Sequence, residues 1–214
     1  MGLIRKGVTE LRSSSVCPGL KCALCLLLLG RLVTDVGLHY AQLGEYSQAM
    51  TCFLAALEDC NRRVDEGKTK AVLLQNIGAI HNAQAQYSTS LSYHVHAAEL
   101  FGALGQRRGQ AESLGNLAYA FSQLRDYQAA ALCYQEALQA FRAVGDLHGH
   151  WQMCEGLGAS HFCLGDTQKA IEYYKQALAM SEEPKGIWAI PRERIQRKLT
   201  EALQNAGAGE DTQL

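Results

Sequence analysis

Apolar and small residues recur along this chain with the spacing of helices, and the pattern repeats about every forty residues. Four small residues, Gly37, Gly78, Ala118 and Gly158, are separated by 41, 40 and 40 positions. Apolar residues stand four and one positions before each of them, and an alanine follows nineteen positions later in all four cases. A fixed period of this length is the signature of a repeat architecture. The pattern therefore predicts an array of similar units.

Each unit is predicted to consist of two helices. The first is centred on the small residue, and the second carries small, aromatic and small residues at the i, i+4 and i+7 offsets of a helical stripe. Small residues let two helix axes approach closely, so we expect these positions in the core. The second unit departs most from the pattern, because His81, Ser90 and His94 occupy three of its core positions. We expect this unit to be the least stable, since buried polar groups need partners.

The predicted fold is all-α: a right-handed solenoid of about four helix-turn-helix repeats, closed by a C-terminal helix. Ile195, Leu199 and Leu203 are spaced by four with charged residues between them, which indicates an amphipathic capping helix. The predicted segments are a poorly ordered leader at 1–24, repeats at 25–64, 65–104, 105–144 and 145–184, the capping helix at 187–205 and a disordered tail at 206–214.

The residues at these positions resemble the tetratricopeptide repeat, in which a large residue, Leu-Gly, Tyr, Ala, Phe and Ala follow at fixed offsets. The first unit reads Val33, Val36-Gly37, Tyr40, Ala49, Phe53 and Ala56, and the fourth reads Cys154, Leu157-Gly158, His161, Ala170, Tyr174 and Ala177. The family's proline near offset +24 is absent, and the period is about 40 where the family standard is about 34. Both departures indicate the longer-helix subclass of the Leu-Gly-Asn and rapsyn type, which carries turns similar to Gly145-Asp146. The resemblance covers roughly 25 to 182 and implies a protein-binding solenoid.

In this family the first helices of the repeats line a concave groove, which is the surface expected to bind a protein or peptide partner. The candidate groove residues that the resemblance implies are Arg31, Thr34, Gln75, Asn76, Asn82, Glu112, Asn116, Tyr119, Gln123, Gln152 and Glu155. The basic clamp that some members use to hold chaperone carboxylate tails is missing, and only Asn76 and Asn116 match it. These two amides either hold the main chain of a partner segment or bond within the array.

Charge and cysteine content narrow the class of function. The chain has 20 basic and 21 acidic residues, so its formal charge of −1 predicts binding to neither nucleic acid nor a membrane. The eight cysteines lie within or beside apolar helical patterns. We expect them to be reduced and the protein to be cytoplasmic, because disulfide frameworks belong mainly to short secreted chains.

The sequence holds no set of residues that indicates catalysis. Gly67-Lys68-Thr69 lacks the preceding strand and the earlier glycine of a phosphate-binding loop. The pair Cys22 and Cys25 lacks a second pair at zinc spacing, and the His94/His96 and His148/His150 pairs lack a third ligand. We therefore expect a non-enzyme without metal or cofactor.

Three interpretations of function remain. The favoured one is an adaptor that binds a partner segment in the groove. The second is a structural module that associates weakly with itself and takes no peptide ligand. The third is a secreted or membrane-tethered form directed by the apolar residues 22–29, which are too few to span a bilayer and lack a clear cleavage site. The simpler interpretation of that run is the start of the first helix.

Overall fold

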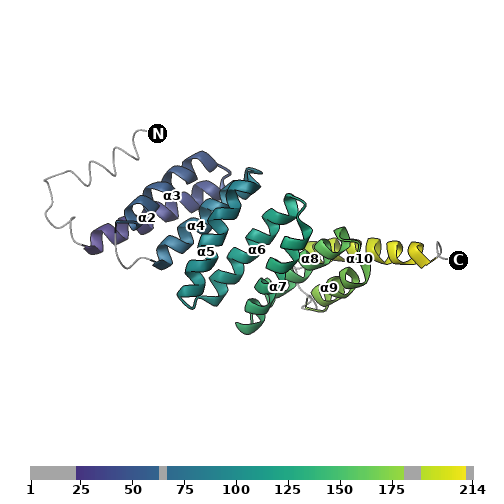
Figure 1. The fold of residues 1–214 in the computed structure, drawn as a ribbon. Coiled ribbons are helices and arrows are strands. Elements are labelled where there is room, and N and C mark those ends of the chain that lie inside the picture. Colours follow the sequence, from purple (N-terminus) through teal and green to yellow (C-terminus); the bar gives the residue numbers. More distant parts are fainter. Residues whose placement is uncertain (1–22, 63–66, 181–188, 211–214) are drawn as a thin grey trace.

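The computed structural model describes residues 23–62, 67–180 and 189–210, and every regular element in these ranges is an α-helix (Figure 1). The helices are α2 (Ala23–Gln42), α3 (Tyr46–Cys60), α4 (Gly67–Ala83), α5 (Tyr87–Ala103), α6 (Arg107–Gln123), α7 (Tyr127–Ala143), α8 (Leu147–Cys163), α9 (Thr167–Ala179) and α10 (Ala189–Glu210). Successive helices pack against one another, and the pairs stack into an elongated array with α2 at one end and α10 at the other (Figure 1). The predicted all-α repeat fold is confirmed.

Tight turns join successive helices, both within a pair and between pairs. Gly165 has a φ of +81°, a left-handed conformation that glycine adopts without a steric penalty. Asp166 follows it and caps α9, because its Oδ1 accepts a hydrogen bond from the backbone N–H of Lys169 at 3.2 Å. The Gly145-Asp146 turn between α7 and α8 works in the same way, with a φ of +69° at the glycine and a cap on Gly149 N at 3.0 Å.

The small residues of the repeat pattern lie in the core, as predicted. The alanines at offset +19, Ala56, Ala97, Ala137 and Ala177, are all buried. Ring side chains of the second helices lie directly over glycines of the first helices. These contacts are Phe53 on Gly37, His94 on Gly78 and Tyr174 on Gly158. In the third unit Ala118 replaces the glycine, and the Tyr134 ring lies against Gly156 of α8, where an added Cβ would be 2.6 Å from Cζ.

A second series of ring–glycine contacts joins one helix pair to the next. Phe101 of α5 lies against Gly109 of α6, and Phe141 of α7 lies against Gly149 of α8. All four residues are buried or partly buried. Because each ring fills the space left by a glycine in the following pair, the apolar core continues from one pair to the next.

The predictions for the two ends of the chain concern the leader and the last helix. Most of the predicted leader at 1–24 lies outside the described residues. At the other end, α10 continues to Glu210, beyond the predicted helix end at 205. Leu203 was expected on the packing face of this helix, but it is 47% exposed, and Ala202 is buried instead. Ala202 follows Ile195 by seven residues, which returns to the same helical face, whereas eight residues do not.

Candidate partner-binding groove

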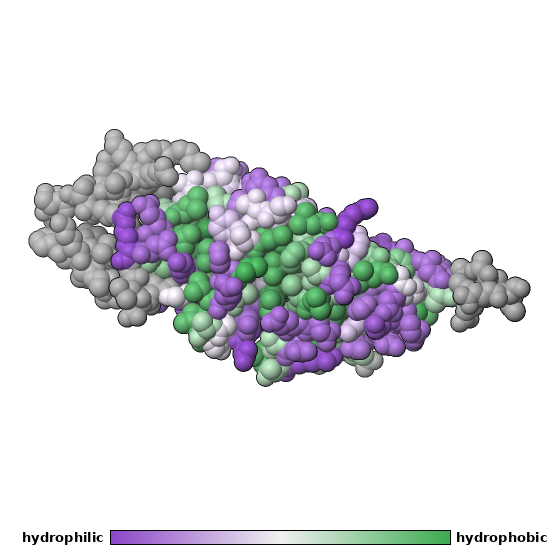
Figure 2. Space-filling model, viewed as in Figure 1, coloured by the Kyte–Doolittle hydropathy of each residue, from purple (hydrophilic) through white to green (hydrophobic). Residues whose placement is uncertain are grey.

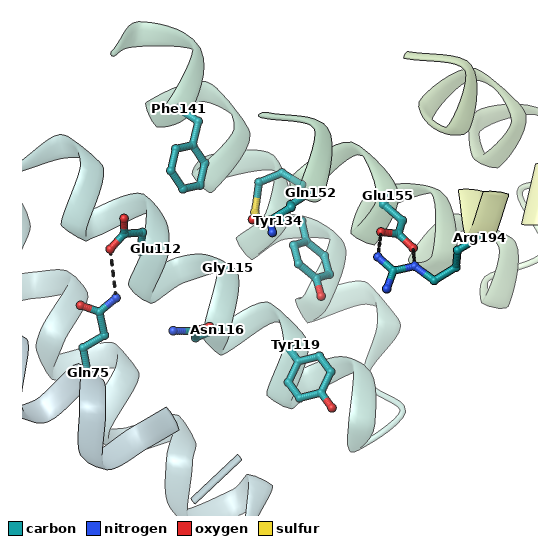
Figure 3. A pocket seen from close by; sticks show the side chains of 11 residues that line it. Gln75, Glu112, Gly115, Asn116, Tyr119, Tyr134, Phe141, Gln152, Glu155 and Arg194 are labelled. Atoms are coloured by element: carbon teal, nitrogen blue, oxygen red, sulfur yellow. Dashed lines mark hydrogen bonds and ion pairs between the residues drawn. The ribbon is translucent and has the colours of Figure 1, made fainter. Parts of the chain in front are cut away.

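A cavity of about 470 Å³ lies across the first helices of the second, third and fourth pairs and reaches α10. We call it the groove; its lining residues are Gln75, Glu112, Gly115, Asn116, Tyr119, Tyr134, Phe141, Gln152, Met153, Glu155 and Arg194 (Figure 3). Six of the eleven residues predicted from the sequence line it: Gln75, Glu112, Asn116, Tyr119, Gln152 and Glu155.

Aromatic and amide side chains line the middle of the groove. Tyr119 is 44% exposed, and its ring meets the Tyr87 ring edge-on at a centroid distance of 6.1 Å. Burial and the neighbouring Tyr87 raise the pKa of Tyr119, so its hydroxyl stays protonated at neutral pH. The side-chain amides of Asn116 and Gln152 line the groove and make no hydrogen bond with any described residue (Figure 3). The middle of the groove therefore offers an aromatic surface beside two amides.

Glu112 of α6 carries the negative charge at one end of the groove. Its carboxylate accepts a hydrogen bond from Arg108 Nε at 3.2 Å and a long one from Gln75 Nε2 at 3.4 Å. Arg108 also pairs with Asp146 at 3.1 Å, so it divides its charge between two carboxylates. Because the side chains of Arg108 and Glu112 are 69% and 42% exposed, solvent weakens this pair.

Glu155 of α8 lies at the other end of the groove and is paired with α10. Its carboxylate accepts hydrogen bonds from Arg194 Nε at 2.8 Å and Arg194 Nη2 at 2.6 Å (Figure 3). Lys198 Nζ donates a third at 2.8 Å. The sequence analysis missed Arg194 and Lys198 because it assigned the charged face of the last helix to solvent. Their four-residue spacing, which places two basic side chains on one helix face, was the available signal.

Asn82 does not line the groove, and its side chain holds three helices together. Its Nδ2 on α4 donates to His94 Nε2 of α5 at 3.1 Å and to the carbonyl of Asn116 on α6 at 3.2 Å. Asn82 was predicted as a groove residue; in the structure the donor group of its amide is used inside the array. No sequence pattern distinguishes such a bridging amide from an exposed one.

Four other predicted residues also lie outside the groove. Arg31 and Thr34 belong to α2, where the Thr34 hydroxyl donates to the Gly30 carbonyl at 2.9 Å. Asn76 is partly buried on α4 and does not line the cavity. Gln123 lines a second, smaller cavity of about 310 Å³ near the turn between α6 and α7. The candidate binding surface is therefore the part of the array between α4 and α10.

Within 23–62, 67–180 and 189–210, no group of three or more histidine, cysteine or acidic side chains is placed to hold a metal ion. Cys52, Cys60, Cys133, Cys154 and Cys163 are thiols rather than disulfides. Burial raises the pKa of Cys133 and of Cys154 to about 11, which keeps both protonated and unreactive at neutral pH.

The hydropathy of the array bears on whether it inserts into a membrane. Hydrophobic residues gather over the middle of the face viewed in Figure 2, and hydrophilic residues border them. In the described part of the chain, no helix has the length and apolar character needed to cross a membrane.

Solved structures share this arrangement of helices. BtubC (BKLC) from P. vanneervenii is 18% identical, with a TM-score of 0.77 over 95% of this chain and 81% of that one. A putative kinesin light chain of Podosopora anserina with nearly identical TPR-like repeats is 14% identical, with a TM-score of 0.68 over 86% and 89%. The apo form of RapI is 16% identical, with a TM-score of 0.76 over 84% of this chain and 64% of that one. These likenesses show the fold.

Family models agree with the structural likeness. One tetratricopeptide-repeat model matches residues 69–143, and a second matches residues 152–184. Together the two matches span about half of the chain and cover most of the residues of α4 to α9, the helices that carry most of the groove. The chain therefore belongs to the tetratricopeptide-repeat family.

Proposed function

We propose that this chain is a non-catalytic adaptor that binds a segment of a partner protein in the groove between α4 and α10. The tetratricopeptide-repeat fold commonly mediates protein–protein interaction, and the groove lies on the helices that this fold uses for binding. The observation that carries the proposal is the pair of amides, Asn116 and Gln152, which face the groove without an internal hydrogen-bond partner.

The chemistry of the groove suits a peptide main chain. A side-chain amide offers one acceptor and two donors, so it can pair with both the N–H and the C=O of an extended or helical segment. Tyr119 lies one helical turn from Asn116 on α6 and provides exposed aromatic surface for a partner side chain. The groove has charged residues at both ends and aromatic surface beside two amides in the middle, and interfaces commonly combine such polar and aromatic surface.

A random-peptide display library, selected on the full chain, tests the proposal. Enriched peptides should bind the wild-type chain, and their binding should fall about tenfold or more in the double variant Asn116→Ala with Gln152→Ala, because each lost amide removes about 1 kcal/mol. Gln139→Ala, at an exposed position on α7, is the matched control and should leave binding unchanged. Selected peptides that bind the double variant as tightly as the wild type would refute the groove as the binding surface.

Asn76 provides a second comparison, because the structure places it outside the groove. Asn76→Ala should leave peptide binding unchanged, whereas Asn116→Ala should weaken it, although both residues take the same position in successive first helices. Circular dichroism of each variant checks that the array is intact.

Self-assembly is a second candidate function, favoured by the surface of α2. Leu32 and Val36 on this helix are 59% and 38% exposed, and Leu43, in the turn that follows it, is 76% exposed. Exposed apolar groups of this kind favour association. The mass of the full chain, measured by size-exclusion chromatography with light scattering over a range of concentrations, separates a self-assembling module from a monomeric adaptor.

We also propose two finer assignments. The period of about forty residues and the Gly145-Asp146 turn support membership of the longer Leu-Gly-Asn and rapsyn subclass, and the stretches 116–124 and 151–159 are similar to tetratricopeptide repeat protein 24 of vertebrates. The thiol state of the described cysteines supports a cytoplasmic location, since disulfides form in oxidising compartments. Fractionation of cells that express the full chain tests the location.

A further inference from the structure

The contact between α10 and Glu155 places a basic helix at one end of the groove. Glu155 is nearly buried, with 9% of its side chain exposed, and three charge-assisted hydrogen bonds from α10 satisfy it. Arg194 supplies two of these bonds as a planar fork, and Lys198 supplies the third one turn later. Arg194 is itself a lining residue of the groove. The resident helix therefore fills this end of the proposed binding surface.

A buried carboxylate is a costly way to hold a capping helix. Moving a charge out of water is expensive, and a well-packed apolar contact in the same place is often equally stable or more so. The carboxylate does, however, restrict what can lie against it, because only a group with matching donors repays its desolvation. Glu155 therefore selects a basic helix at this end of the groove and disfavours an acidic or purely apolar one.

The apolar contacts of α10 are few. Of its apolar side chains at positions 192–207, Ile195 and Ala202 are buried, and Leu199 and Ala206 are partly buried. By comparison, α8 buries eight residues, including Trp151, Met153 and Leu157. Elements with few buried apolar contacts open at lower free energy than the rest of a fold. The pairing with Glu155 therefore ties α10 to the groove, while the helix as a whole packs mainly on α9.

We propose that the groove end at Glu155 is a recognition site for a basic amphipathic helix of a partner protein, and that α10 occupies this site within the chain until such a helix replaces it. The resident helix shows what the partner must carry: an arginine, an apolar residue directly after it, and a lysine four positions after the arginine, as in Arg194, Ile195 and Lys198. This inference rests on the proposed function, because it names the partner chemistry for one end of the same groove.

A fluorescent synthetic peptide of residues 189–210, added to the full chain, tests the proposal by anisotropy. The chain variant Arg194→Ala with Lys198→Ala weakens the resident helix and leaves Glu155 in place. It should bind the peptide about tenfold more tightly than the wild-type chain, since the competitor within the chain is weaker. Adding Glu155→Gln to this variant should abolish the gain. Glu201→Gln, at an exposed position of α10, is the control and should behave as wild type.

A charge-exchange experiment distinguishes loss of the ionic contact from loss of folding. A peptide with Arg194→Glu and Lys198→Glu should not bind the Arg194→Ala, Lys198→Ala chain, and it should bind when that chain also carries Glu155→Arg. Equal binding of the peptide to the wild type, the double variant and the Glu155→Gln variant would overturn the proposal.

Amide exchange in residues 189–210 of the same chains gives an independent readout. Exchange there should be faster in the Arg194→Ala, Lys198→Ala chain and unchanged in residues 107–163. A helix that stays protected, or one that is released while the peptide fails to bind, would overturn the proposal. A double variant that becomes a dimer would also overturn it, because α10 of a second copy would then fill the site. Library peptides that depend on Asn116 and Gln152 would still support the adaptor function in each of these cases.

Discussion

The ring of Tyr174 lies against the backbone of Gly158, so closely that a Cβ on the glycine would be 2.5 Å from Cε1 and 2.6 Å from Cδ1 of the ring. Glycine in the middle of a helix is about 0.5–1 kcal/mol less favourable than alanine. Its presence here is explained by the ring, which takes the space of the missing side chain. The same arrangement joins Phe53 to Gly37 at the start of the array.

Replacing this glycine should destabilise the protein although alanine is the better helix former. We expect Gly158→Ala to lower the free energy of unfolding by about 1–3 kcal/mol, because the Tyr174 ring must move away from a packed position. Gly30→Ala is the matched control, since no atom lies within 4 Å of an added Cβ there, and it should be neutral or stabilising. Urea midpoints decide the matter; a Gly158→Ala midpoint equal to or above that of Gly30→Ala would contradict the prediction.

Ala170 tests the same packing from the second helix of a pair. It is fully buried on α9, so Ala170→Leu should lower the free energy of unfolding by about 1–3 kcal/mol through overpacking. Gln168→Leu adds a leucine at an exposed position of the same helix and should change stability by less than about 0.5 kcal/mol. The two urea midpoints would coincide if Ala170 had room for a larger side chain.

The fold could be predicted because the small residues that determine the helix packing recur in every unit. Glycine and alanine at fixed offsets report where two helices approach, and four copies of the pattern make a chance match implausible. The end of α10 could not be predicted, because Ala206 and Gly207 lie in a polar stretch without strong helix signals, while Ile195 and Ala202 hold the helix against α9. Packing against a neighbour decided the helix length there, and intrinsic propensity did not.

The groove was only partly predictable, for a related reason. Register within a first helix follows from the period, and Glu112, Asn116 and Tyr119, predicted from that register, line the groove. Asn82 shares that register, yet it faces His94, an aromatic position that carries a polar ring only in the second pair. Arg194 enters the groove from a helix outside the repeat pattern, and its contact with Glu155 depends on how α10 packs. Pairings that depend on the packing of distant segments leave no periodic signal.

The helix pair α4 and α5 should open before the pair α6 and α7. Ser90 and His94 are buried in it, and both His94 Nδ1 and Asn82 Oδ1 are buried without a hydrogen-bond partner. Each such atom costs about 1–3 kcal/mol. Amide exchange by mass spectrometry should therefore be about tenfold or more faster in residues 67–103 than in residues 107–143. Slower exchange in 67–103 than in 107–143 would show that these polar groups do not weaken the pair.

His94 should also make the stability of the array depend on pH. Burial is the main reason that the pKa of His94 falls from the ordinary 6.5 to about 4, with a smaller contribution from the nearby His81 and an opposing one from the Gly78 carbonyl. Asn82 Nδ2 donates to His94 Nε2, so the native ring is neutral and carries its proton on Nδ1. Protonation of Nε2 would break this hydrogen bond.

The direction follows from proton linkage. Between pH 6.5 and about 4 the unfolded chain binds a proton at this histidine that the folded chain does not, so the stabilisation present above pH 6.5 is lost as the pH falls through this range. The loss attributable to His94 should approach about 3 kcal/mol at pH 4. His94→Phe, which restores the ring type of Phe53, should remove that part of the pH dependence while carboxylates elsewhere still titrate. Urea unfolding of both chains at pH 7.5, 5.5 and 4.5 measures the difference, and parallel profiles would show that folding does not lower the pKa of His94.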